Sequence, residues 1–218
     1  MAAGQTPEQG RASFARQDNV SNEILDQFDK WNTILSKWNK SINLVQRSSM
    51  EQFWTRHAAD SWQVTDYIVG PIETAIDLGS GGGFPGLAVG IWLKLQGQGA
   101  VTLVESAGKK ASFLRAAARN MALPVKVETE RAEHLEPKPY DLITARAFAP
   151  LLPLFGYAER FYGPKTQIIL LKGASIAQEI EQAQSAFEFE YRLHPSATDP
   201  QGYVMTSGHL RRRENKTE

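Results

Sequence analysis

The residues best suited to chemistry form a glycine-rich segment, Asp77–Gly86, in which half of the residues are glycine. An apolar run, Thr74–Leu78, leads directly into the glycines, and Pro85 suits the first turn of a following helix. Glycines let the backbone turn sharply and approach a ligand closely. A helix start presents free N–H groups and a positive dipole end to an anion. The segment therefore predicts a nucleotide-binding loop at the carboxyl end of a strand.

Two acidic residues indicate which nucleotide this loop binds. Gly81, Gly83 and Gly86 match the dinucleotide pattern G-x-G-x-x-G, which is weak evidence by itself. Asp77, beside the loop, would repel a pyrophosphate but suits a cationic amino group and a sulfonium centre. Glu105 ends the next predicted strand, where it can accept hydrogen bonds from both ribose hydroxyls. Together they favour S-adenosylmethionine over NAD.

Two cationic side chains end later strands of the pattern. Arg146 follows the apolar run 142–145, and such a charge requires a partner or a ligand. We expect it to position the substrate near the reacting methyl group; the alternative is a structural salt bridge to Glu133 or Asp77. Lys172 ends the fifth predicted strand and is a second positioning candidate facing the same cleft.

The elements that must position these residues alternate along the chain after Gly70. Helical patterns separate the successive apolar runs, which predicts a doubly wound, Rossmann-like α/β fold with a mostly parallel sheet and helices on both faces. The last two strands have no helix between them and predict an antiparallel hairpin. The predicted strands are 74–78, 101–105, 125–129, 141–145, 166–171, 189–193 and 203–207, and the predicted helices are 85–95, 109–122, 149–161 and 175–187.

The sequence before this domain is organised differently. Residues 1–20 are small and polar and predict a flexible tail, not a signal peptide. Residues 21–71 predict a helical extension, with one helix over Ser21–Asn39 and a second that starts at a capping box, Ser48–Glu51. Within the second helix we expect Arg56 to pair with Asp60 and the tryptophans to be core residues. The cofactor-binding domain is assigned to residues 72–218.

Composition excludes several classes of protein. There is no cysteine, and the four histidines have no ligand spacing, so neither a disulfide framework nor a metal site is expected. No apolar run is long enough to cross a membrane, and a cytoplasmic monomer is expected. Lysines and arginines equal aspartates and glutamates at 24 each, which argues against indiscriminate coating of nucleic acid. Local basic clusters, each of which is also typical of a solvated face, are Lys37, Lys40, Arg47 and Arg56, then Lys109, Lys110, Arg115 and Arg119, then Arg211–Arg213.

Short motifs spread over residues 31–207 resemble those of one family. They are Trp38-Asn39-Lys40 with Asn43-Leu44, Arg56-His57 with Asp60-Ser61, the loop Asp77–Gly86, Gly108-Lys109-Lys110, Arg131-Ala132-Glu133, Arg146-Ala147-Phe148 and Leu171-Lys172-Gly173. The chain resembles the bacterial small-subunit rRNA methyltransferase G family, also called glucose-inhibited division protein B. The resemblance implies methylation of N7 of a guanine in 16S rRNA (guanosine 527 by the family's usual naming), with the rRNA or the small ribosomal subunit as partner.

The resemblance also implies roles for particular residues. Ala132 and Glu133 would hold the adenine side of the cofactor, and Phe148 could stack on the target base or belong to the core. Gly82 stands where the family commonly has alanine. Because guanine N7 carries a free lone pair, no general base is required, and catalysis consists of alignment and exclusion of water. The expected cofactor contacts are Asp77, Gly79, Ser80, Gly81, Gly83, Phe84, Glu105, Ser106, Ala132, Glu133 and Arg146.

Three other functions remain open from the sequence. The chain could methylate a small molecule, with the helical extension as a lid over the site. It could be an NAD(P)-dependent oxidoreductase, although no Tyr-x-x-x-Lys pair is recognisable and Asp77 suits a pyrophosphate poorly. It could also bind RNA or the ribosome without catalysis and retain only the fold.

Overall fold

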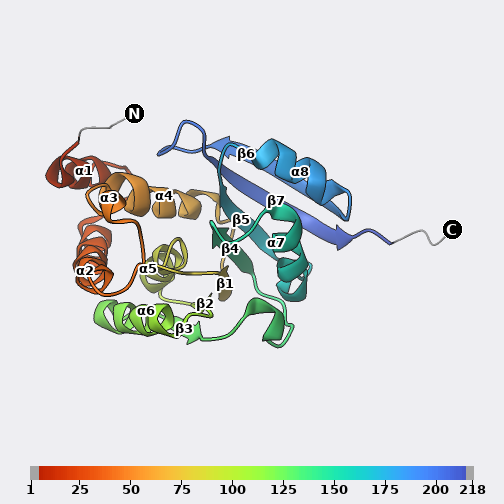
Figure 1. Ribbon diagram of the computed structural model, residues 1–218, viewed down its shortest axis with the longest axis horizontal. Coiled ribbons are helices and arrows are strands. Elements are labelled where there is room, and N and C mark those ends of the chain that lie inside the picture. The colour runs from red at the N-terminus through yellow and green to blue at the C-terminus, as the bar shows by residue number, and fades with distance from the viewer. Residues whose placement is uncertain (1–4, 215–218) are drawn as a thin grey trace.

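In the computed structural model, which describes residues 5–214, one twisted sheet of seven strands organises the chain (Figure 1). The strand order is β3-β2-β1-β4-β5-β7-β6, with β1 to β5 parallel and β7 antiparallel to both of its neighbours. The strands are β1 (Thr74–Leu78), β2 (Ala100–Val104), β3 (Val125–Glu128), β4 (Leu142–Arg146), β5 (Gln167–Lys172), β6 (Phe187–Pro195) and β7 (Tyr203–Arg212). The predicted fold class is confirmed, because the sheet is mostly parallel with an antiparallel end.

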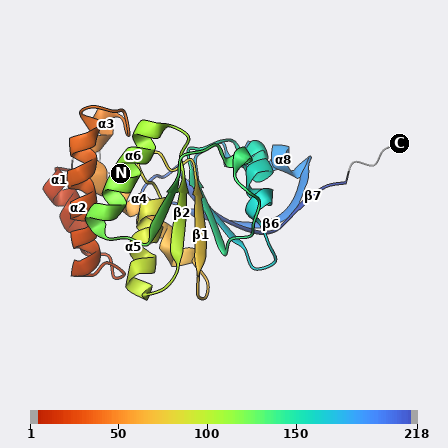
Figure 2. The same cartoon turned by 90° about the horizontal axis from the view of Figure 1, so that it is seen from below.

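Helices cover both faces of this sheet, as Figure 2 shows in side view. Strand residues alternate between two apolar clusters: Leu142 and Ile169 face α5 and α6, whereas Ile143 and Ile168 face α7 and α8. This alternation is the period of two that a strand imposes on its side chains. The helices are α5 (Gly86–Gln96), α6 (Gly108–Met121), α7 (Leu151–Ala158) and α8 (Ile176–Gln184), with short 3-10 turns η3 (Ala132–His134) and η4 (Glu159–Phe161).

The terminal hairpin is longer than the sequence predicted. Its second strand, β7, lies inside the sheet and pairs with β5, and the first strand, β6, forms the edge. The predicted helix 175–187 ends at Gln184, because Phe187 is fully buried as the first residue of β6. The hairpin thus extends the sheet beyond β5.

The N-terminal part begins with a helix that the sequence analysis placed in a flexible tail. Helix α1 (Pro7–Phe14) has a capping box: the Gln9 backbone N–H donates to Thr6 Oγ1 (3.3 Å) and the Thr6 N–H donates to Gln9 Oε1 (2.9 Å). Phe14 is buried between Phe28 and Trp54, at ring distances of 4.8 and 5.7 Å. Burial of this side chain, together with the ion pair of Arg11 and Asp29, holds α1 on the extension. Residues 1–4 of the predicted tail lie outside the described residues.

The rest of the extension begins with α2 (Asn22–Asn39), whose N-cap is Ser21. It continues with α3 (Arg47–Met50), a π-helical turn η1 (Phe53–Ala58), α4 (Ala59–Trp62) and a 3-10 turn η2 (Gln63–Tyr67). The predicted capping box at Ser48 is wrong, since α3 starts after Gln46 and has no side-chain cap. Trp31, Trp54 and Trp62 are buried core residues, as predicted, and Trp38 is half-buried against the same cluster. They share one apolar cluster with α5 and α6. No helix in residues 5–214 has the length and apolar character that crossing a membrane requires.

Candidate active site

The glycine loop follows β1 at the carboxyl edge of the sheet, next to the point where the strand order reverses between β1 and β4. Gly79 has φ +70° and Gly83 has φ +95°, both in the left-handed region that glycine tolerates. A Cβ on Gly79 would lie 2.2 Å from Phe148 Cδ2, so neither backbone nor space admits another residue there. Helix α5 starts at Gly86 with Pro85 as its N-cap, one residue later than predicted. The loop has the position and shape of a nucleotide-binding turn.

Glu105 ties this loop to the neighbouring strand. It directly follows β2, and its carboxylate accepts hydrogen bonds from the Gly81 N–H (3.0 Å) and the Ala107 N–H (2.8 Å). Ser80, which precedes Gly81, is buried, and its N–H donates to the carbonyl oxygen of Val104 (3.0 Å), the last residue of β2. The predicted cofactor residues Gly81 and Glu105 are therefore in direct contact. Ser106 is exposed immediately beside them.

Asp77 lies beneath the loop and is completely buried. Its Oδ1 accepts a hydrogen bond from Thr144 Oγ1 (2.7 Å), whereas Oδ2 has no hydrogen-bond partner among the described residues. A Cβ on Gly86 would come within 2.6 Å of Oδ2, which places the carboxylate under the first turn of α5. Burial raises the pKa of Asp77 to about 6, and the Thr144 hydrogen bond opposes that rise. A buried carboxylate with one oxygen left without a hydrogen bond within residues 5–214 fits a cationic group bound at this edge.

Phe84 turns away from the sheet and into the helical extension. Its ring stacks on Trp31 (4.6 Å) and on His57 (4.8 Å), and the Arg146 guanidinium lies 4.5 Å from its centre. A Cβ on Gly82 would come within 2.8 Å of this ring. The loop aromatic thus fastens the glycine loop to the extension, and glycine at position 82 leaves space for its ring.

Asn39 organises a further segment beside the loop, a role that the sequence analysis did not identify. Its Oδ1 accepts hydrogen bonds from the backbone N–H groups of Leu44 (2.8 Å) and Val45 (3.1 Å), and its Nδ2 donates to Val45 O (3.1 Å). The segment after α2 is thereby folded so that Leu44 O faces Gly82. The signal available in the sequence was the motif Trp38-Asn39-Lys40 with Asn43-Leu44.

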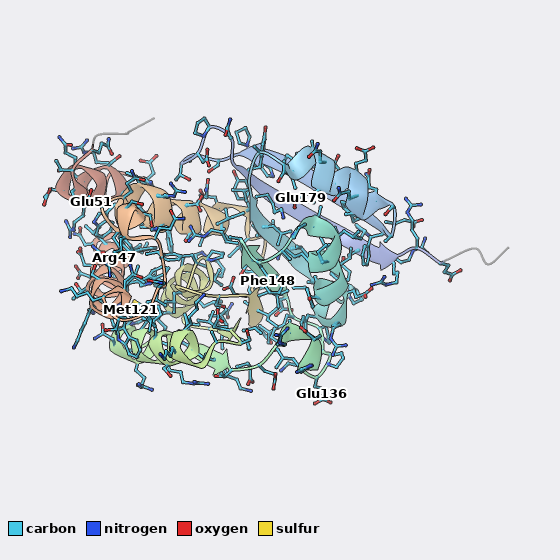
Figure 3. The ribbon with its side chains drawn as sticks, in the orientation of Figure 1. Arg47, Glu51, Met121, Glu136, Phe148 and Glu179 are labelled. Carbon is cyan, nitrogen blue, oxygen red and sulfur yellow. The ribbon has the colours of Figure 1, made fainter. Side chains whose placement is uncertain are left out.

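Phe148 packs directly against Gly79 and is partly exposed; its position in the molecule is labelled in Figure 3. It follows Ala147, which has φ +50°, and its ring also packs on Tyr157 at 5.3 Å. Ala132 is buried at the start of η3, whereas Glu133 is exposed and pairs with Arg131 at 3.7 Å. Glu133 therefore has freedom to reach a ligand, and Phe148 presents an aromatic surface beside the glycine loop.

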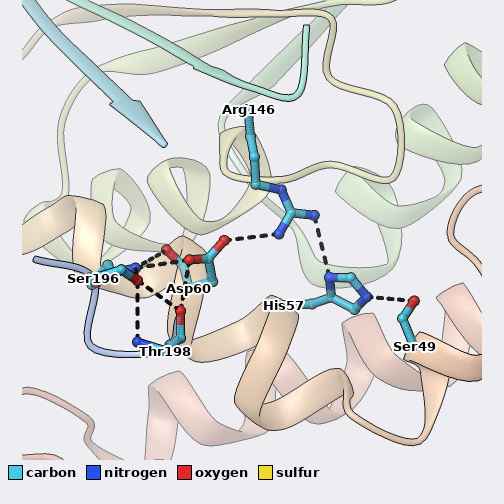
Figure 4. Close-up of polar contacts among 7 residues, drawn as sticks. Ser49, His57, Asp60, Arg146, Ser196 and Thr198 are labelled. Carbon is cyan, nitrogen blue, oxygen red and sulfur yellow. Dashed lines mark hydrogen bonds and ion pairs between the residues drawn. The ribbon is translucent and has the colours of Figure 1, made fainter. Parts of the chain in front are cut away.

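Arg146 ends β4 and is held by two side chains of the extension (Figure 4). Its Nη1 donates to Asp60 Oδ2 (3.1 Å) and its Nη2 donates to His57 Nδ1 (3.4 Å). Since arginine only donates, His57 carries its proton on Nε2, which donates to Ser49 Oγ (3.0 Å). Burial lowers the pKa of His57 to about 3, and the charge of Arg146 adds to the effect, so the imidazole is neutral at pH 7.

Asp60 is the centre of this network and replaces the partners that the sequence suggested. The expected Arg56–Asp60 pair is wrong, because Asp60 binds Arg146, and Arg146 pairs with Asp60 rather than with Glu133 or Asp77. The other oxygen, Oδ1, accepts from Gln63 Nε2 (2.9 Å) and Thr198 Oγ1 (2.9 Å). The turn between β6 and β7 is thus fixed to the extension at the same edge of the sheet.

Lys172 is engaged elsewhere. It forms an ion pair with Glu179 of α8 and donates to Ala149 O (3.2 Å). Glu179 also accepts from the Leu151 N–H (2.9 Å) and from Ser175 Oγ (2.6 Å). This buried pair joins the starts of α7 and α8, so the structure does not bring Lys172 together with Arg146. No group of three or more metal-ligating side chains occurs in residues 5–214.

Comparison with known proteins places this site in a family. The model of a family described as rRNA small subunit methyltransferase G, also called GidB, matches residues 24–200. The chain belongs to this family. It is 40% identical over 188 residues to a protein of Cereibacter sphaeroides named ribosomal RNA small subunit methyltransferase G, covering 86% of this chain and 90% of that one. A protein of the same name from Hyphomonas neptunium is 38% identical, covering 94% of this chain and 97% of that one.

Solved structures share the fold at low identity. TYW2 of M. jannaschii, in complex with AdoMet, superimposes with a TM-score of 0.55 at 12% identity, covering 80% of each chain. The ribosomal protein L11 methylase of Lactobacillus delbrueckii subsp. bulgaricus superimposes with a TM-score of 0.53 at 16% identity, covering 72% of this chain and 78% of that one. These likenesses agree with the Rossmann-like sheet.

Proposed function

We propose that this member of the rRNA small subunit methyltransferase G family transfers the methyl group of S-adenosylmethionine to N7 of a guanine in 16S rRNA, at the position usually called guanosine 527. The observation that carries the proposal is the glycine loop joined to Glu105 by the Gly81 hydrogen bond, in a chain that matches the family over residues 24–200. The reaction would take place in the cytoplasm, where the small subunit is made, with the chain acting as a monomer.

The residues at the carboxyl edge of β1, β2 and β4 fit the cofactor. The N–H groups of the glycine loop would meet its methionine carboxylate, and Glu105 with Ser106 would hold its ribose. Asp77, beneath the loop, would place a negative charge near the amino group and the sulfonium centre of the cofactor. Ala132 and Glu133 would border its adenine. When bound, S-adenosylmethionine supplies an electrophilic methyl group on a sulfonium centre.

The remaining residues would align the nucleophile. Guanine N7 has a lone pair and no proton at neutral pH, so no side chain has to remove one; the neutral His57 holds Arg146 rather than accepting a proton from substrate. Within residues 5–214, Arg146 makes two of its five possible hydrogen bonds, which leaves donors for a guanine edge or a phosphate. Phe148 supplies a surface on which a base can stack. Alignment and exclusion of water are sufficient for this reaction.

The geometry argues against a lid over a small-molecule site. Trp31 and Trp62 of the extension are buried in the same apolar cluster as α5, and Phe84 of the loop is stacked on Trp31. A segment that forms part of the core cannot swing away from the site without losing that burial. The helical extension is therefore a fixed wall of the site.

The test is transfer of labelled methyl from S-adenosylmethionine to small subunits that lack the modification, followed by nucleoside analysis of the 16S rRNA. We expect label in 7-methylguanosine, and none when subunits already modified at that guanine are used. Label in a different nucleoside would overturn the N7 assignment. Binding of the cofactor without label in any rRNA would overturn the substrate.

A further inference from the structure

The three basic clusters of the sequence have different environments in the structure. Acidic neighbours offset most of the charge of the C-terminal cluster: Arg211 and Arg213 share Glu188, and Arg212 pairs with Glu159. It also lies away from the active site, because β7 starts beside Lys172 at the carboxyl end of β5 and runs past Ile168 at the amino end. These arginines therefore lie at the opposite edge of the sheet from the glycine loop.

The other two clusters contain exposed cations without such partners. Lys40, Arg47, Arg56 and Lys109 are exposed and Lys110 is half-buried, and none of the five forms an ion pair or a side-chain hydrogen bond within residues 5–214. From Lys40 to Arg56 the sequence contains one acidic residue, Glu51. The group as a whole is strongly positive in a chain of zero net charge.

Contacts around the site bring this group to its border. The segment after Lys40 ends at Leu44, whose carbonyl faces Gly82 of the glycine loop. Arg47 begins α3, which carries the Ser49 hydroxyl bonded to His57, and Figure 3 shows Arg47 on the side of the extension. Arg56 is exposed and directly precedes His57, the side chain that holds Arg146.

Lys109 and Lys110 approach the same border from the sheet. They stand in the first turn of α6, which begins four residues after the end of β2 and contains no acidic residue. Glu105 precedes this turn, and its carboxylate is already bound to the backbone N–H groups of Gly81 and Ala107. Cations are unfavourable in that position, because the helix dipole is positive at its N-terminus. An anion bound at this edge would remove the conflict and use both lysines.

We propose that Lys40, Arg47, Arg56, Lys109 and Lys110 form a phosphate-binding rim that seats the backbone of the substrate rRNA around the active site, and that Arg211–Arg213 take no part in it. The inference rests on the proposed function and assigns the surface through which that substrate is held. Phosphate contacts of this kind orient an enzyme on RNA without reading its sequence. The acidic partners of the C-terminal arginines, set against the unpaired cations of the rim, explain how a chain of zero net charge directs RNA to one edge.

The experiment compares two double variants, R47A/R56A and K109A/K110A, with a matched control, R211A/R213A. Binding of each full-length protein to unmodified small subunits is measured over a range of KCl concentrations. The binding constant K falls as salt rises, so the plot of log K against log salt has a negative slope. Each lost phosphate contact reduces the magnitude of that slope by about 0.7 to 0.9. We expect each rim variant to reduce the magnitude of this slope by about one to two and to weaken binding to subunits about tenfold. The control variant should keep the wild-type slope and affinity for subunits. The affinity of every variant for S-adenosylmethionine should equal that of the wild type.

The outcomes separate this inference from the proposed function. An equal loss of slope in the control, or none in either rim variant, overturns the rim even if wild-type enzyme methylates the subunits. Wild-type protein that binds subunits with the expected slopes but transfers no methyl group supports the rim and overturns the catalytic proposal. Wild-type protein that does not bind subunits overturns both.

Discussion

Replacing Asp60 by asparagine tests the network that holds Arg146. The side chains of Asp60 and Arg146 are 17% and 19% exposed, so their pair is largely shielded from water. The asparagine side chain would still offer one oxygen to Gln63 and Thr198 but would present an NH₂ group to the Arg146 Nη1 donor. A hydrogen bond to a charged group contributes about 1.5–3 kcal/mol, and a guanidinium left without its counter-charge adds a desolvation penalty. We expect the free energy of unfolding to fall by about 2–3 kcal/mol.

Urea unfolding measures this change, with the slope m checked for constancy between variants. The matched control is Arg212→Gln, which removes the exposed ion pair with Glu159; we expect a loss below about 1 kcal/mol. A double-mutant cycle with Arg146→Gln isolates the pair itself, for which we expect a coupling energy of about 1–3 kcal/mol.

The same substitution displaces the guanidinium at the end of β4 and should lower kcat for methyl transfer about tenfold, equivalent to about 1.4 kcal/mol in the barrier. The affinity for S-adenosylmethionine should be unchanged, because Asp60 makes no hydrogen bond to the glycine loop within residues 5–214. Unfolding free energies of Asp60→Asn and wild type that agree within about 0.5 kcal/mol would refute the reasoning. So would a coupling energy near zero.

Three further substitutions test the loop, the first helix and the buried carboxylate. Gly79→Ala should weaken S-adenosylmethionine binding at least tenfold, as measured by calorimetry, because the new Cβ would lie 2.2 Å from a ring atom of Phe148. The control Gly97→Ala has the same φ of +70° with open space around it, and it should leave the affinity unchanged. Phe14→Ala should lower the free energy of unfolding in urea by about 3–5 kcal/mol. The control Val69→Ala, at an exposed position, should lower it by less than about 0.5 kcal/mol. Equal losses would show that Phe14 does not anchor α1. For Asp77 the folded-state pKa of about 6 exceeds the ordinary value of 3.8, so the folded state binds more protons and stability falls as pH rises from about 4 to 6. The fall, up to about 3 kcal/mol, should be absent in Asp77→Asn when the two proteins are unfolded in urea across that range, and parallel pH profiles would contradict it.

The sequence was sufficient to predict the sheet, the glycine loop and the family. Alternating apolar runs and helical periodicity are local properties, and they placed β1 at its observed bounds and the other parallel strands within one residue of theirs. The need for glycine at positions 79 and 83 is also local, because it follows from a positive φ. The capping box at Ser48 failed because α3 begins at Arg47, after Gln46, which places Ser48 inside the helix and not at its N-cap.

Only the tertiary structure decided which charges meet. Arg146 pairs with Asp60, which is 86 residues away in the chain, and Lys172 pairs with Glu179. The C-terminal arginines form ion pairs with Glu188 of β6 and Glu159 of η4. A charged side chain reaches several partners of opposite sign, and local patterns do not rank them. The choice depends on which elements pack together and on which side chains burial removes from water. For this protein, therefore, the residue types that line the site were readable from the sequence, and their pairing was determined by packing.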